Sequence, residues 1–222
     1  GLGDLSHEIA RSMPRRVELR VYSDARSDAP AIERSSRFDA DAIPPGDVPL
    51  YNAWGASGRV RGKAVDAGFG LRSDFEKLRT DGIELKGAIA LAKYGRAYRG
   101  VKAQMAEEFG CAGVLLYSDP ASDGGEKGPV WPEGPWKPDW EAQRGSILPI
   151  ANAPGDPTTP GWASAKPGVA CERLAREEVD ARLPQIPCIP IGARDARAIR
   201  ALLKTDASDA PLGPGPVEVE ID

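Results

Sequence analysis

Alternating apolar and polar residues predict strands near both ends of the chain. The segments 17–23 (VELRVYS) and 217–221 (VEVEI) place every second side chain on one face, which is typical of a half-buried strand. Two central segments, 87–94 (GAIALAKY) and 112–118 (AGVLLYS), are apolar almost throughout, so they are predicted to be fully buried strands. A further short strand is expected around Val65.

Helical spacing of apolar residues predicts three helices. The first, in LRSDFEKLR, is expected to open on a capping box made by Ser73 and Glu76. The second, in GVKAQMAEEFG, is expected to stop at Gly110, and the third lies in ARDARAIRALLK. The residues expected on their inner faces are Phe75 and Leu78, then Val101, Met105 and Phe109, then Ala196, Ile199 and Leu203.

The order of these elements favours an α+β fold. The apolar segment 184–192 (PQIPCIPIG) contains three prolines, which lack the N–H that a central ladder needs, so it is predicted to be an edge strand. About six strands and three helices in mixed order favour the α+β class over a doubly wound sheet.

Residues 119–165 form a long irregular stretch that is rich in tryptophan. It holds four of the five tryptophans, namely Trp131, Trp136, Trp140 and Trp162. Because disordered segments are poor in aromatic residues, we expect this stretch to pack against other structure.

Composition excludes several classes of protein. A net charge of −4 and a pI of about 5.3 disfavour a nucleic-acid-binding protein. No apolar run approaches the ~20 residues of a membrane span, and the first residues lack the pattern of a signal peptide. Three cysteines cannot all form disulfides within the chain. Cys111 and Cys188 lie in apolar segments and are expected to be buried, whereas the sequence around Cys171 predicts neither burial nor exposure.

A single histidine, His7, argues against a catalytic centre within this chain. Ser–His–Asp and Cys–His catalysis need a histidine inside a structured site, and a di-zinc site usually needs two or more. His7 lies in a polar stretch near the start of the chain.

A basic cluster marks the most interesting candidate site. Arg96, Arg99 and Lys102 lie where a buried strand passes into the first turn of a helix. Basic residues there oppose the helix dipole, and arginine can grip a carboxylate with two hydrogen bonds. A carboxylate or phosphate site and a solvated basic edge paired with nearby acidic residues both remain open.

Four motifs in order carry a resemblance to a known family. They are LKGAIALAKYGRAYRGVKAQMAEEFGCAGVLLYSDP, QRGSILPI, GDPTTPGW and LPQIPCIPIGARDA. The chain resembles the protease-associated (PA) domain inserted into glutamate carboxypeptidase II-like zinc metallopeptidases, relatives of the transferrin receptor. The resemblance implies a mixed β-sandwich or barrel with about three flanking helices. It implies a PA domain over 17–222, with 1–16 leading in from the catalytic domain.

The resemblance also implies a function. Such a domain covers the active-site cleft of a carboxypeptidase-like or aminopeptidase-like hydrolase and helps to bind the C-terminal carboxylate of a peptide. The zinc ligands belong to the catalytic domain, so we expect this chain to be inactive alone and to hold no cofactor of its own. Zinc, calcium, export or membrane anchoring, and a possible homodimer are implied for the parent. The alternative is a non-catalytic interaction module, as in the transferrin receptor or in sorting receptors.

Individual positions take their expected roles from this resemblance. Arg99 matches the arginine that grips a substrate carboxylate, and Arg96 lies where the family has a basic residue near the same pocket. Ser146 stands where the family has an asparagine, and serine is shorter and has no amide, so the resemblance does not imply a preference for a C-terminal glutamate. Thr159 and Trp162 match ligands of a calcium ion that glutamates of the catalytic domain complete.

Overall fold

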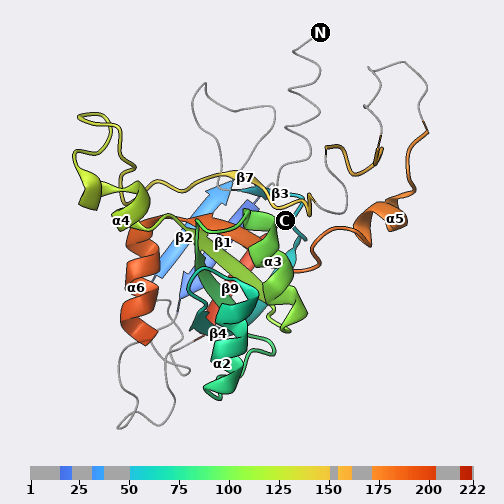
Figure 1. The fold of residues 1–222 in the computed structure, drawn as a ribbon, viewed down its shortest axis with the longest axis horizontal. Helices are drawn as coiled ribbons and strands as arrows, with labels where there is room; N and C mark the ends of the chain where they lie inside the picture. The colour runs from blue at the N-terminus through green and yellow to red at the C-terminus, as the bar shows by residue number, and fades with distance from the viewer. Residues whose placement is uncertain are drawn as a thin grey trace.

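A seven-stranded sheet and a two-stranded ribbon organise the fold. The computed structural model describes residues 16–21, 32–37, 51–150, 155–161, 172–203 and 216–221. The large sheet has the order β2-β1-β9-β4-β5-β6-β8. Figure 1 labels β2, β1, β9 and β4 of this sheet. Its strands are β1 Arg16–Val21, β2 Ile32–Arg37, β4 Gly58–Asp66, β5 Ile89–Lys93, β6 Gly113–Tyr117, β8 Cys188–Ile191 and β9 Pro216–Ile221.

The large sheet changes from antiparallel to parallel within β4. Residues 58–63 pair antiparallel with β9, and their side chains alternate between half-buried and exposed. Ala64 and Val65 are buried and pair parallel with β5, which continues in parallel into β6 and β8. Parallel strands covered on both faces are apolar throughout, which explains the near-continuous apolar sequence of β5 and β6.

Two apolar cores lie on the two faces of the parallel half. Ile89 and Leu91 of β5 point to the face covered by α6 (Ala193–Leu203). Ala90 and Ala92 point to the opposite face, which is covered by α2 (Arg72–Thr80) and α3 (Arg99–Glu108) (Figure 1). The predicted inner residues Ala196 and Ile199 of α6 are buried, whereas Leu203 is only partly buried.

Helix α3 buries a different face from the one that the sequence predicts. Ala103 and Ala106 are completely buried, whereas Val101 is 37% exposed. The small side chains let the helix lie close to the alanines of β5, so the larger residues are displaced to its flanks, where Met105 and Phe109 pack partly against the core. The predicted stop is confirmed, because Gly110 has a φ of +84°.

The predicted capping box of α2 is also displaced. The helix begins at Arg72, so Ser73 lies inside the first turn. The capping carboxylate is Asp74 instead of Glu76. Its Oδ2 accepts the backbone N–H of Leu71 at 3.0 Å and that of Phe69 at 3.1 Å. A shorter acidic side chain reaches these two donors of the preceding loop.

The remaining elements surround the parallel half of the sheet. The structure adds the short strands β3 (Asn52–Ala53) and β7 (Gly145–Ser146), which pair parallel with each other, to those predicted. It also adds β2, and the short helices α4 (Pro120–Asp123), η1 (Gly125–Lys127) and α5 (Arg176–Asp180). The α+β class is confirmed, and β8 lies at the edge of the sheet as predicted.

The described part of the tryptophan-rich stretch contains α4 and η1. Trp131 and Trp140 are 69% and 59% exposed, Trp136 is half-buried, and Trp162 lies outside the described residues. Cys111 and Cys188 are buried free thiols as predicted. Cys171 and His7 also lie outside the described residues. None of the helices described here has the length and apolar character that crossing a membrane requires.

Candidate anion-binding site

The carboxyl ends of the parallel strands bring the basic residues to one edge of the sheet. Ligands of open α/β sheets usually bind outside these strand ends. Arg96 and Arg99 follow β5 there, and β7 lies beside them, since Tyr98 Oη donates to the Ser146 carbonyl at 2.5 Å. The structure therefore brings together the segments of three predicted site residues, Arg96, Arg99 and Ser146.

Arg99 is held in place by an aromatic ring and a glycine. Its guanidinium carbon lies 5.5 Å from the centre of the Tyr94 ring. Its Nη1 lies against Gly145, where an added β-carbon would be only 1.4 Å away. Among the described residues no carboxylate pairs with this half-buried guanidinium. The arrangement holds the guanidinium in place, and no partner of opposite charge is found for it in the described part of the chain.

Tyr94 is half-buried and belongs to a neutral polar group next to Arg99. Its hydroxyl donates to the Gln143 carbonyl at 2.7 Å. Burial raises the pKa of this phenol, and the nearby Arg99 charge opposes the rise only in part. Asn52 Nδ2 donates to Cys188 Sγ at 3.4 Å, and burial raises the pKa of that thiol to about 12. The phenol and the thiol are therefore uncharged at neutral pH, so they do not neutralise Arg99.

Arg96 occupies a strained turn. Its φ is +61°, a left-handed value that is uncommon for a residue other than glycine. The Ala97 N–H donates to the Gly95 carbonyl at 2.8 Å and closes a three-residue turn around it. The exposed guanidinium stacks on the Phe69 ring, 4.2 Å from the ring centre. The turn thus presents a second cation at the same edge of the sheet.

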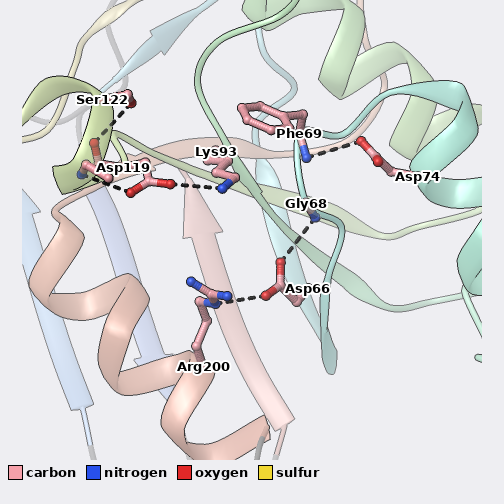
Figure 2. A network of polar contacts seen from close by, with 9 residues as sticks. Asp66, Gly68, Phe69, Asp74, Lys93, Asp119, Ser122 and Arg200 are labelled. Atoms are coloured by element: carbon pink, nitrogen blue, oxygen red, sulfur yellow. Dashed lines mark hydrogen bonds and ion pairs between the residues drawn. The ribbon is translucent and has the colours of Figure 1, made fainter.

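A network of polar contacts fixes the neighbouring loop after β4 (Figure 2). Asp66 Oδ1 accepts the Gly68 N–H at 3.1 Å, and its Oδ2 lies 2.8 Å from Arg200 Nε of α6. Lys93 Nζ donates to Asp119 Oδ2 at 2.9 Å, and this bond lowers the pKa of Asp119. Lys93 is therefore neutralised, whereas Arg96 and Arg99 have no carboxylate partner within the ranges that the structure describes.

Comparison with known proteins identifies a domain within the chain. Residues 49–138 match the PA domain family. The chain contains a PA domain. The matched residues include Arg96 and Arg99, whereas Ser146 and Thr159 lie beyond them.

Relatives of this PA domain are named as glutamate carboxypeptidases. A probable glutamate carboxypeptidase of Arabidopsis thaliana is 39% identical over 76% of this chain and 24% of its own length. A glutamate carboxypeptidase 2 homolog of Caenorhabditis elegans is 33% identical over 83% of this chain and 26% of its own length. The chain therefore spans about a quarter of these relatives.

A solved structure supports the fold of the PA domain. The aminopeptidase from Aneurinibacillus sp. strain AM-1 superposes with a TM-score of 0.51, at 14% identity, over 95% of this chain and 31% of that protein. At this identity the likeness concerns the fold alone.

Ser146 uses its polar atoms mainly for the backbone. Its Oγ accepts the Leu148 N–H at 3.1 Å, and its carbonyl accepts the Tyr98 hydroxyl. The hydroxyl proton of Ser146 has no acceptor among the described residues, so it can still be donated to a ligand.

The GDPTTPGW loop is described only up to Gly161. Thr159 is buried at 2% exposure, and Trp162 lies outside the described residues. Asp156 Oδ1 accepts from Thr158 N at 2.8 Å, and its Oδ2 accepts from Arg173 Nη1 at 3.0 Å. The loop carboxylate is thus engaged by protein donors, and a calcium site here would need oxygen ligands from elsewhere.

Three residues of this site have a place in the structure that their sequence did not predict. Lys102 was expected to share the basic edge with Arg96 and Arg99, but its side chain is completely buried. Its spacing from Ala103 and Ala106 placed it on the buried face of α3, a signal that the predicted apolar stripe obscured. Tyr94 and Gly145 gave no signal, because only the fold brings them to Arg99.

Proposed function

We propose that this PA domain is the accessory domain of a zinc-dependent, carboxypeptidase-like exopeptidase, where it covers the active-site cleft and helps to bind the substrate's C-terminal carboxylate. One observation carries the proposal. The Arg99 guanidinium is fixed between Tyr94 and Gly145 and has no carboxylate partner among the described residues. A positioned, unneutralised guanidinium is suited to an anion supplied by a ligand.

The start of α3 adds to this preference for an anion. Arg99 is the first residue of a ten-residue helix whose first turn contains no acidic residue. Within the described part of the chain no side chain caps this end. Free N–H groups and the helix dipole therefore reinforce the positive charge of Arg99. A planar carboxylate can accept two parallel hydrogen bonds from the guanidinium.

The parent protein would supply the remaining chemistry. The described residues contain no group of three or more His, Cys, Asp or Glu that could hold a metal ion, so zinc would bind to residues elsewhere in the parent. Bound zinc would activate the water that cleaves the peptide bond. We further propose that Ser146 contacts the substrate's C-terminal residue, and that Thr159 and Trp162 contribute to a calcium site that the catalytic domain completes. We also propose that the parent is exported or membrane-anchored and that it forms a homodimer.

The test is a pair of substitutions at Arg99 in the parent peptidase. Arg99→Ala should cost about 2–4 kcal/mol of transition-state stabilisation, or roughly 30- to 1,000-fold in kcat/KM, because a bidentate charge-assisted pair is lost. Arg99→Lys should recover only part, since an ammonium cannot reproduce the planar fork. Arg182→Ala, at an exposed arginine, is the matched control.

Two measurements decide the outcome. Kinetics are recorded on a peptide with a free C-terminal carboxylate and on the same peptide with a C-terminal amide, and thermal melting is recorded for every variant. Arg99→Ala should abolish the preference for the carboxylate and leave the melting temperature close to that of the control. Unchanged kinetics together with a large fall in melting temperature would make Arg99 a structural residue and overturn the proposal.

A further inference from the structure

We propose that Lys102 is a positioning residue whose buried ammonium ties the loop after β4 to the turn after β5, and so presents Arg96 and Arg99 to the anion. The inference deepens the function proposed above and rests on it. Lys102 itself would not touch the ligand. It would act through the backbone that carries the two arginines.

The burial of Lys102 is the first observation. Its side chain is completely inaccessible, although lysine is among the residues least often buried. It projects from the buried face of α3 beside Ala103 and Ala106. The stem passes Gly70, where an added β-carbon would lie 3.2 Å from the Lys102 Cβ. Gly70 has a φ of +65°, so both backbone conformation and space favour glycine there.

The two acceptors of Lys102 belong to different loops. Its Nζ donates to the Phe69 carbonyl and, at 2.8 Å, to the Gly95 carbonyl. Phe69 lies between β4 and α2, whereas Gly95 lies between β5 and α3. A charge-assisted bond to each carbonyl holds the two loops at one fixed separation.

The Gly95 carbonyl links this tie to the strained turn. The same oxygen accepts the Ala97 N–H at 2.8 Å, which closes the turn with Arg96 at φ +61°. A strained conformation persists only where the surroundings hold it. Lys102 supplies such a hold, because its ammonium binds the oxygen on which the turn closes.

The Phe69 ring joins the tie to the Arg96 side chain. Arg96 stacks 4.2 Å from the ring centre, and the Lys93 and Lys102 ammonium groups lie 4.6 Å and 5.9 Å from it. Fixing the Phe69 backbone therefore also fixes the surface on which Arg96 lies. Burial lowers the pKa of Lys102 to about 8, and the Asp74 carboxylate of α2 opposes that shift. The ammonium form therefore predominates at neutral pH.

The first experiment compares Lys102→Met with Lys86→Met, an exposed control in the turn before β5, in the parent peptidase. Substrates are the peptide with a free C-terminal carboxylate and its C-terminal amide. Lys102→Met should raise KM about tenfold for the carboxylate peptide and change the amide peptide less than about twofold. Lys86→Met should change neither. An equal loss on both peptides, or an unchanged KM, would overturn the positioning role.

The outcome also separates this inference from the proposed function. If Arg99→Ala abolishes the carboxylate preference and Lys102→Met does not, only the role of Lys102 fails. If Arg99→Ala has no effect on that preference, the proposed function fails with it.

A second experiment on the 222-residue chain covers the case in which Lys102→Met perturbs folding. Thermal unfolding is measured for Lys102→Met, Arg96→Gly and the double variant. Glycine adopts φ +61° without strain, so it should make the turn less dependent on Lys102. The fall in melting temperature caused by Lys102→Met should be clearly smaller in the Arg96→Gly background. Additive effects, or a double variant as unfolded as Lys102→Met alone, would contradict the inference.

Discussion

Two loops at the same edge of the sheet differ in whether their charged side chains form ion pairs. In the loop after β6 both aspartates are paired, because Asp119 forms an ion pair with Lys93 of β5 and Asp123 forms one with Lys137 at 3.0 Å. The loop after β5 places Arg96 and Arg99 at the neighbouring strand end with no carboxylate partner among the described residues.

The two loops also differ in backbone strain. After β6 the chain enters α4 through an ordinary cap, in which Asp119 Oδ1 accepts the Ala121 N–H at 3.1 Å. After β5 it passes through the strained turn at Arg96 before α3 begins. The comparison indicates that the first loop stabilises the fold and that the second is arranged for a ligand.

The largest effect that would test this comparison is expected at Gly145. Gly145→Ala would drive a β-carbon into the Arg99 guanidinium and displace it while keeping its charge. We expect kcat/KM of the parent for a free-carboxylate peptide to fall about 10- to 100-fold, because misplacement of a binding group can be as costly as its loss. Gly125→Ala in the loop after β6 is the control, since its β-carbon would meet only Val130 at 3.3 Å. Equal effects at both glycines would remove the distinction between the loops.

A smaller effect is expected from paired substitutions at Arg96. Arg96→Ala and Arg96→Gly should both lower kcat/KM by roughly three- to tenfold, since both remove an exposed guanidinium whose contribution is about 1 kcal/mol. Arg96→Gly should be more stable than Arg96→Ala by about 1 kcal/mol, because only glycine tolerates the left-handed φ. The measurements are steady-state kinetics and denaturant unfolding. Equal stability of the two variants would show that the turn is not strained.

The smallest effect is expected at Asp119, and it should concern stability alone. Asp119→Asn keeps an oxygen for the cap of α4 but loses the ion pair with Lys93, so it should cost about 0.5–1 kcal/mol of unfolding free energy. The pKa of Asp119 is lowered in the folded state, so this contribution is present above its ordinary value and is lost as the pH falls through the folded pKa. The stability difference between wild type and variant should therefore disappear in strong acid. A large fall in kcat/KM at neutral pH would place Asp119 in the binding site instead.

The sequence by itself determined most of the elements and the candidate arginines. The apolar segments of β5 and β6, the stop at Gly110 and the edge position of the proline-rich β8 follow from local rules of burial and backbone geometry. Arg96 and Arg99 could be singled out from the sequence because cations at a helix N-terminus oppose the helix dipole, which indicates a role other than helix stability. These signals lie within a few neighbouring residues, so they can be read along the chain.

Only the tertiary structure decided how those residues are used. The order of strands places β9 between β1 and β4, and long-range pairing of this kind leaves no mark in the local pattern. Lys102 has the same charge as its neighbours in sequence, yet it is buried because its face of α3 meets the sheet. Gly145 and Tyr94 fix Arg99 across separations that no periodicity records. Burial and contact between distant segments depend on how the elements pack. That packing leaves Arg99 available to a ligand and buries Lys102, three residues further along the chain.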